Sequence, residues 1–126
     1  MAAGDEDEDD EIAEAVMIDW RAWEYLLRER GVILDRPRGS AHPRFPEMIY
    51  PLDYGYISGT VGGDGAEVDV FVGGGDAGLN AALITHDLGK DDRELKLLWN
   101  TTATENAAAL AFLQRDAMRV TLRYRR

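Results

Sequence analysis

Carboxylates gather around residues 64–70, which have the sequence DGAEVDV. The residues from Glu67 to Val72 have the composition of a β-strand, so Glu67 and Asp69 are predicted to share one face of it. Asp64 lies in the glycine-rich turn just before this strand and can turn toward the same side. Carboxylates that converge at the end of a strand suit a hard cation with oxygen ligands, such as Mg²⁺ or Mn²⁺. The alternative is a solvated strand face beside a polar turn.

A second charged segment, residues 91–96, has the sequence DDRELK. In a strand, Asp92, Glu94 and Lys96 alternate with the residues between them and lie on one face. Taken alone, this pattern indicates a solvated strand edge. Beside the first group of carboxylates it would bind phosphate, because an ammonium group and a metal ion together neutralise a polyanion.

Cationic side chains also lie in a stretch rich in glycine and proline, where they comprise Arg36, Arg38, His42 and Arg44. The planar guanidinium group of arginine matches the oxygens of a phosphate, although arginines in a loop are often only solvated. Farther along, Tyr54 precedes Gly55, a position at which a backbone can approach closely. The hydroxyl of Tyr54 is therefore a candidate ligand contact.

Short strands, with helices mainly toward the two ends of the chain, must position these residues. Apolar residues at helical spacing predict an amphipathic helix over residues 11–30, and a capping box at Thr102–Glu105 begins a second helix that runs to about Gln114. Strands are predicted at Tyr54–Val61, Glu67–Val72, Leu79–Thr85, Glu94–Asn100 and Val120–Arg125. This order of elements indicates an α+β fold, mainly β, in the form of a small barrel.

The composition of the chain bounds its size and class. The 126 residues, 45% of them hydrophobic, suffice for one domain, which we predict at residues 11–126. The absence of cysteine and the presence of only two histidines exclude disulfide scaffolds, thiol nucleophiles and three-histidine metal sites. No segment approaches the roughly 18 apolar residues of a membrane span. The N-terminus is acidic where a secretory signal would be basic and then apolar, so we expect a soluble, cytoplasmic protein without membrane contact.

Charge is distributed unevenly along the sequence. The formal net charge is −10, and residues 5–11 alone supply seven of the 24 acidic side chains. We predict that residues 1–10 form a disordered, solubilising tail; a tail that docks a partner is the alternative. The acidic balance argues against nucleic-acid binding, which requires a basic surface.

The tyrosine and aspartate motifs together resemble a known family. Residues 50–56, YPLDYGY, followed by Asp64-Gly65 and Val68-Asp69-Val70, are similar to the signature of the soluble family I inorganic pyrophosphatases. The stretch Asp35–Thr60 is closer still to a short, divergent branch of that family, and the resemblance covers roughly residues 32–112. It implies a five-stranded, OB-like barrel with a helix from each end of the chain packed outside. It also implies Mg²⁺-dependent hydrolysis of pyrophosphate to two phosphates, and assembly into a closed homo-oligomer.

This resemblance assigns metal ligands. Asp64 and Asp69 match the first and third aspartates of the signature, which bind the activating metal ions. Glu94 is implied as a further ligand. Either Asp92 or Asp91 matches an aspartate slightly upstream, and the choice between them is open.

The same resemblance assigns residues to the substrate. Tyr54 and Lys96 match residues that contact phosphate. Arg44 is the first choice for the arginine that binds substrate, and Arg38 is the second. The Tyr-Lys pair that ends the C-terminal helix of the family is not evident here, and Arg115 is the nearest cation.

One departure from the signature affects catalysis. Ala66 stands where the family has an aspartate that helps to ready the attacking water, and Glu67 is the candidate to replace it, which makes Asp64, Asp69 and Glu67 the catalytic set. This departure favours one alternative, a catalytically weakened homologue that binds metal or phosphate. Two further functions stay open on other grounds: a hydrolase of another phosphoanhydride and an OB-type nucleic-acid module. The last would need a basic face with aromatic side chains, whereas the face expected here is rich in carboxylates.

Overall fold

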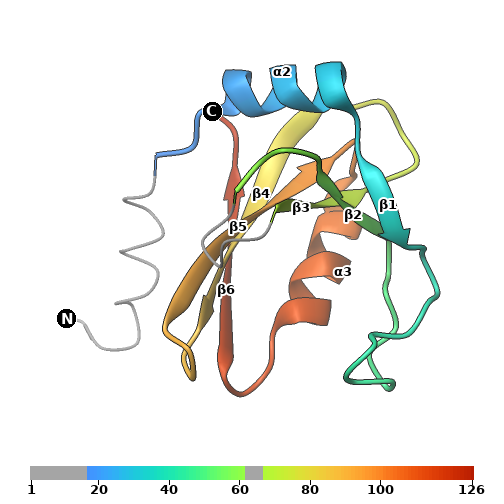
Figure 1. The fold of residues 1–126 in the computed structure, drawn as a ribbon, viewed down its shortest axis with the longest axis vertical. Coiled ribbons are helices and arrows are strands. Elements are labelled where there is room, and N and C mark those ends of the chain that lie inside the picture. Colours follow the sequence, from blue (N-terminus) through green and yellow to red (C-terminus); the bar gives the residue numbers. More distant parts are fainter. Residues whose placement is uncertain (1–16, 62–66) are drawn as a thin grey trace.

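A computed structural model of the chain describes residues 17–61 and 67–126 (Figure 1). The elements follow in the order α2 (Trp20–Arg30), β1 (Ile33–Arg36), β2 (Asp53–Ile57), β3 (Val68–Val72), β4 (Leu79–Asp87), β5 (Asp92–Trp99), α3 (Ala103–Leu113) and β6 (Met118–Tyr124). The α+β class, mainly β, is as predicted. Neither helix in these two ranges has the length and apolar character needed to span a membrane.

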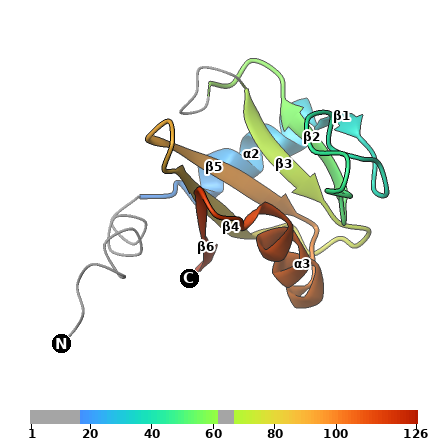
Figure 2. The same ribbon diagram turned by 90° about the horizontal axis from the view of Figure 1, so that it is seen from below.

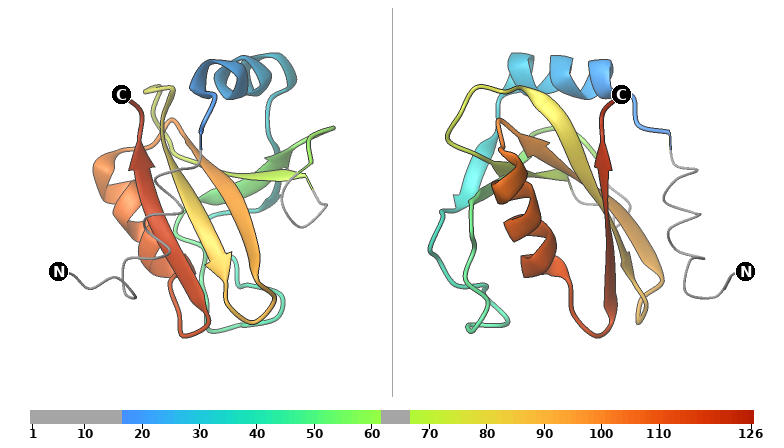
Figure 3. Two further views of the ribbon diagram at one scale, coloured as in Figure 1. Left: turned by 90° about the vertical axis from the view of Figure 1, so that its left-hand side faces the viewer. Right: turned by 180° about the vertical axis from the view of Figure 1, so that it is seen from behind.

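The strands form one mixed sheet in the order β1-β2-β3-β5-β4-β6. All neighbouring strands are antiparallel except β3 and β5, which run parallel. The sheet is strongly twisted, so that β2 and β3 cross the direction of β4 and β6 at a steep angle (Figure 3). Within the described residues β1 and β6 remain its two edges and do not pair with each other. The sheet therefore has six strands and is open, and the five-stranded barrel is not confirmed.

Each face of the sheet is covered by one helix (Figures 1 and 2). On the α2 side, Leu27 packs with Val70 and Leu97, while on the α3 side Phe71 packs with Ala109. Both faces of β3 are thus largely buried, because successive side chains of a strand point to opposite sides. The cluster of polar side chains described below lies on the α3 side.

The two helices test the sequence predictions differently. Helix α3 begins as predicted, since the Thr102 hydroxyl accepts from the Glu105 backbone N–H at 3.2 Å and the Glu105 carboxylate accepts from the Thr102 N–H at 2.9 Å. Helix α2 begins at Trp20 and not at residue 11, because the Asp19 side chain accepts from the Ala22 N–H at 3.2 Å and caps the helix there. Residues 1–16, including the predicted tail, lie outside the described residues.

Strand β1 is the sixth strand, which the sequence did not predict. It is short and largely exposed, and it contains two charged residues, so its pattern is weak. Its close pairing with β2 depends on Gly55, where an added Cβ atom would lie 2.0 Å from the Ile33 carbonyl oxygen. Strand β2 ends at Ile57 and not at Val61, because the Ile57 carbonyl accepts from the Thr60 hydroxyl at 2.6 Å and closes a turn.

Candidate active site

Strand register brings a carboxylate, a phenol and an ammonium group together on the α3 side of the sheet. Asp69 of β3 is the register partner of Lys96 on the parallel strand β5. Lys96 Nζ donates to Asp69 Oδ2 at 2.8 Å and to the Tyr54 hydroxyl oxygen at 2.9 Å. The Tyr54 hydroxyl in turn donates to Asp69 Oδ2 at 2.5 Å. These three residues, predicted separately from the sequence, form one Tyr54–Asp69–Lys96 cluster.

The ammonium group of this cluster stays charged. The Lys96 side chain is only 10% exposed, and its Nζ also lies 3.4 Å from Glu94 Oε1. Burial disfavours the charged form, but the carboxylates of Asp69 and Glu94 raise the pKa of Lys96 above its ordinary value. Lys96 therefore provides a fixed positive charge on this face of β5, between the apolar Leu98 and the acidic Glu94.

The phenol of Tyr54 stays protonated. Its ring is buried against Phe71 and Tyr50, with ring centroids 4.7 and 5.1 Å away. Burial raises the pKa of the hydroxyl well above its ordinary value, and Asp69 raises it further, although Lys96 acts in the opposite direction. Tyr54 is thus a hydrogen-bond donor of fixed orientation.

Two of the predicted metal ligands belong to this site. Asp69 and Glu94 place carboxylate oxygens around Lys96 Nζ, with side chains 29% and 24% exposed. Hard oxygen donors that are partly open to solvent suit Mg²⁺, so this donor set fits the expected metal. Among residues 17–61 and 67–126, however, no three acidic or histidine side chains are grouped closely enough to hold an ion. Asp64 lies outside the described residues.

The geometry separates the two neighbouring aspartates at the start of β5. Asp92 stands two residues before Glu94 and so shares its face of the strand. Asp91 has a positive φ of 56°, and its Oδ1 lies 2.8 Å from His86 Nε2. Asp91 is therefore engaged away from Glu94, which favours Asp92 as the ligand. Glu67, exposed one residue before β3, has no described contact with the cluster, and Ala66 lies outside the described residues.

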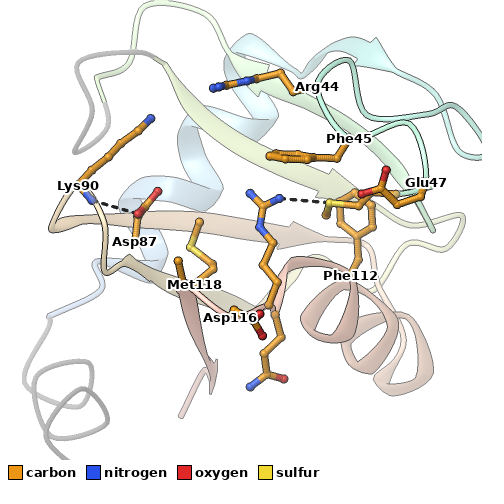
Figure 4. A pocket seen from close by; sticks show the side chains of 12 residues that line it. Arg44, Phe45, Glu47, Asp87, Lys90, Phe112, Asp116 and Met118 are labelled. Atoms are coloured by element: carbon orange, nitrogen blue, oxygen red, sulfur yellow. Dashed lines mark hydrogen bonds between the residues drawn. The ribbon is translucent and has the colours of Figure 1, made fainter.

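A pocket of about 650 Å³ opens on the same face of the sheet (Figure 4). It contains Arg44 from the loop between β1 and β2, Lys90 from the β4–β5 turn and Arg115 from the segment after α3. Asp87 in its wall is the register partner of Asp92, which places the pocket next to the predicted ligands. Arg44 thus shares a pocket with Asp87, the strand partner of a predicted ligand, whereas the three residues of the cluster do not line that pocket.

Arg38, the second choice for a substrate arginine, lies elsewhere. It borders a different hollow of about 400 Å³ that it shares with Tyr50 and Glu105. Its backbone N–H donates to Asp53 Oδ1 at 2.8 Å. This hydrogen bond stabilises the turn before β2 but does not position the guanidinium group of Arg38. Arg38 does not share the pocket that contains Arg44.

The fold is similar to that of solved inorganic pyrophosphatases. The enzyme from Neisseria gonorrhoeae superposes with a TM-score of 0.59 at 14% identity, covering 72% of this chain and 79% of that one. The enzyme from Coxiella burnetii gives 0.54 at 15% identity over 74% and 82%, and the one from Helicobacter pylori gives 0.50 at 15% identity over 74% and 81%. No protein-family model and no curated protein matches the sequence. The chain has a pyrophosphatase-like fold.

Within this pyrophosphatase-like fold, His42 has a role that the sequence analysis missed. Its Nδ1 accepts from the backbone N–H groups of Arg44 and Phe45 at 3.1 and 3.3 Å, which closes a turn and positions both side chains. Burial lowers the pKa of His42, and the charges of Arg36, Arg115 and Arg44 lower it further. The available signal was its place two residues before Arg44, where a side-chain acceptor can close a turn.

Arg36 was singled out from the sequence as a phosphate candidate, but it is used inside the fold. Its Nη1 donates to the Tyr50 hydroxyl at 2.6 Å, and its guanidinium group lies 5.7 Å from the centre of the Tyr50 ring. The Tyr50 ring in turn packs on Phe112 with centroids 4.6 Å apart. Arg36 therefore supports the aromatic wall between the Tyr54–Asp69–Lys96 cluster and the pocket.

Proposed function

We propose that the chain hydrolyses inorganic pyrophosphate to two phosphates, by attack of water at phosphorus with a divalent metal ion bound. The observation that carries this proposal is the Tyr54–Asp69–Lys96 cluster, joined by hydrogen bonds of 2.5–2.9 Å on a pyrophosphatase-like fold. Its ammonium group and phenolic hydroxyl are donors suited to phosphate oxygens, and the neighbouring carboxylates are suited to a hard cation.

Each residue has a separate part in the proposed reaction. Lys96 supplies a permanent positive charge to the phosphate. The Tyr54 hydroxyl donates to Asp69 in the free chain, and it would turn its proton to the phosphate once Asp69 binds the metal ion. Arg44 reaches the substrate from the pocket, whereas Arg38 is a substrate residue only if its exposed side chain swings across from the other hollow. Because the sheet holds the heavy atoms of Lys96 and Tyr54 before substrate arrives, only their hydrogen-bond partners need to change when phosphate binds.

The carboxylates would hold the metal. Asp69 and Glu94, with Asp92 and with Asp64 from the glycine-rich turn, are the proposed ligands of Mg²⁺ or Mn²⁺. When bound, such an ion lowers the pKa of a coordinated water and neutralises charge on the leaving phosphate. Asp64, Asp69 and Glu67 are the carboxylates proposed to orient the water and accept its proton.

A second candidate function is favoured by one feature of the sequence. Ala66 occupies the position at which the family signature has its middle aspartate. The chain therefore lacks one of the carboxylates that would accept a proton from the attacking water. A homologue that binds metal and phosphate but turns over slowly or not at all would have this composition. Binding without phosphate release distinguishes it from the enzyme.

Phosphate release tests the proposal directly. Purified chain is incubated with pyrophosphate, tripolyphosphate or nucleotides, with and without Mg²⁺ or Mn²⁺, and the phosphate formed is measured. We expect metal-dependent release from pyrophosphate, its loss in Asp69→Asn, and no change in Asp76→Asn, a variant of an exposed turn residue outside the site. Phosphate release that persists in Asp69→Asn would refute the assigned site. If no phosphate is released from any of these substrates, the proposed hydrolysis is wrong and the homologue that only binds metal and phosphate is the remaining candidate.

A further inference from the structure

The pocket beside the cluster is larger and less polar than a pyrophosphate ion requires. A volume of about 650 Å³ lies in the range of sites that enclose drug-sized molecules. Four half-buried apolar side chains line it, namely Phe45, Met48, Phe112 and Met118. Pyrophosphate carries no apolar surface to cover them. The pocket therefore has room and surface for an organic group.

The apolar part of the pocket adjoins the proposed reaction site through ring contacts in the core and through strand β5. Phe112 lies 4.6 Å from Tyr50 and Tyr50 lies 5.1 Å from Tyr54, measured between ring centroids. Along β5, Asp92 pairs with Asp87 of the pocket wall, and Glu94 and Lys96 follow on the same face. A ligand that lies along this part of β5 would direct its phosphates toward Lys96 and an attached group toward Phe112.

Cations stand where a phosphate chain would enter this pocket. Arg44 and Lys90 approach from two sides of the opening and point toward one another (Figure 4). The Arg115 guanidinium group lies 4.4 Å from the centre of the Phe45 ring, and its Nη1 lies 3.3 Å from Met48 Sδ. This packing holds the planar guanidinium group of Arg115 inside the pocket. Planar aromatic rings stack on such a group.

The pocket wall also contains hydrogen-bond acceptors. Glu47 and Asp116 are exposed carboxylates in its wall, and carboxylates accept hydrogen bonds from ring N–H and exocyclic amino groups. Cations for phosphates, flat apolar surface for a ring, and acceptors for its edge are the three requirements of a nucleotide.

We propose that the organic group is a nucleobase and that the site also accepts a nucleoside 5′-diphosphate or triphosphate as a substrate. The base would lie between Phe112, Met118 and Arg115, and the phosphates would extend past Arg44 and Lys90 to Lys96. This inference rests on the proposed hydrolysis for its reaction. Water adds to the terminal phosphorus, the bond from that phosphorus to the bridging oxygen breaks, and the products are phosphate, a nucleotide with one phosphate fewer, and a proton released to solvent.

Binding of two analogues that resist hydrolysis separates the base from the phosphates. Calorimetry with Mg²⁺ compares α,β-methylene-ADP with methylenediphosphonate, which has the same P–C–P unit without the nucleoside. We expect the nucleotide analogue to bind at least about fivefold tighter, because stacking of a base on flat side chains has an effect of this size or larger. Phe112→Leu, which keeps an apolar side chain, and Phe45→Ala should each remove this preference while methylenediphosphonate binds as before. Tyr25→Ala, at an exposed aromatic residue of α2, should retain it.

The outcomes separate this inference from the proposed function. Equal binding of the two analogues by the unmodified chain, or an unchanged preference in both phenylalanine variants, overturns the nucleotide site. Phosphate release from pyrophosphate alone, with no nucleotide preference, overturns this inference and leaves the proposed function standing. A nucleotide preference without any phosphate release supports the site and overturns the proposed hydrolysis.

Discussion

Lys96 Nζ lies 2.8 Å from Asp69 Oδ2, and the two residues face each other across the parallel strands β5 and β3. Their backbones are fixed by the only parallel pairing among the described strands, between two strands in which no residue is fully exposed. Because the partner of each charge is held by the sheet, the pair is positioned without help from a loop. A rigid sheet face is a more accurate support for a reaction site than a mobile segment.

Replacing Asp69 with asparagine should remove a metal ligand while it keeps the shape of the side chain. We expect the affinity for Mg²⁺ or Mn²⁺ to fall by at least about tenfold, since even residues that only orient a metal ligand have effects of that size. Titration calorimetry of Asp69→Asn against the unmodified chain measures the change, with Asp76→Asn as the matched control. Equal metal affinity in all three proteins would contradict the assignment of Asp69.

Replacing Tyr54 with phenylalanine removes one hydroxyl and keeps the ring contacts to Tyr50 and Phe71. We expect the free energy of unfolding to fall by about 1–3 kcal/mol, because hydrogen bonds to two charged groups are lost. Because burial raises the pKa of this hydroxyl, the variant should lose no ionisation step near pH 10, where an ordinary tyrosine titrates.

Denaturant unfolding and ultraviolet titration measure these two effects. Tyr56→Phe, two residues along the same strand, is the matched control for stability and should change it less. A tyrosine ionisation near pH 10 that disappears in Tyr54→Phe would show that Tyr54 is not held as described.

The local elements of this fold could be predicted because their signals are local. Thr102 and Glu105 mark the start of α3 within four residues, and the alternation around Val68–Val72 marks β3. The face shared by Glu94 and Lys96 likewise follows from alternation alone. The open sheet could not be predicted, because β1 is recognisable only through its pairing with β2, which depends on Gly55.

The contacts of the site depend on pairings between distant residues. Asp69 and Lys96 were both candidates, but the hydrogen bonds that join them to Tyr54 follow from the parallel register of β3 and β5. The pocket could not be predicted at all, because its walls come from the β1–β2 loop, the β4–β5 turn and the segment around the end of α3. The disordered tail at residues 1–10, the metal ions and the homo-oligomer stay predictions.

His42 should make phosphate binding depend on pH through the turn that it closes. Its Nδ1 can accept from the N–H groups of Arg44 and Phe45 only when the ring is neutral and carries its proton on Nε2. Its pKa is lowered in the folded chain, so the unfolded chain binds the proton more readily. The stability that the neutral ring contributes is therefore present above about pH 6.5 and is lost as the pH falls through the lowered value.

His42→Asn is the informative variant, because an amide oxygen accepts hydrogen bonds but does not titrate in this range. The dissociation constant of methylenediphosphonate, measured between pH 5 and pH 8, should rise toward low pH more steeply in the unmodified chain than in His42→Asn. His42→Ala should bind weakly throughout. Identical pH profiles for the unmodified chain and His42→Asn would rule out this role.

Ala66→Asp restores the carboxylate that the family signature has beside the attacking water. A general base contributes about 10²–10⁴-fold to a rate, whereas water bound to a metal already ionises near neutral pH. We therefore expect slow release of phosphate by the unmodified chain, with a rate that rises with pH, and faster release by Ala66→Asp. Steady-state phosphate release across a pH series measures both effects.

Ala66→Asn is the matched control, because it adds the same volume without a proton acceptor, so a gain in Ala66→Asp alone identifies base catalysis as the missing function. If the unmodified chain already turns over rapidly and Ala66→Asp adds nothing, another carboxylate has taken over the proton. Glu67 is then the first residue to test, since it is the nearest carboxylate along the chain and is exposed one residue before β3. In that case Glu67→Gln should lower the rate by about 10²-fold or more. A rapid enzyme that is indifferent to both Ala66→Asp and Glu67→Gln would exclude this segment as the source of the base.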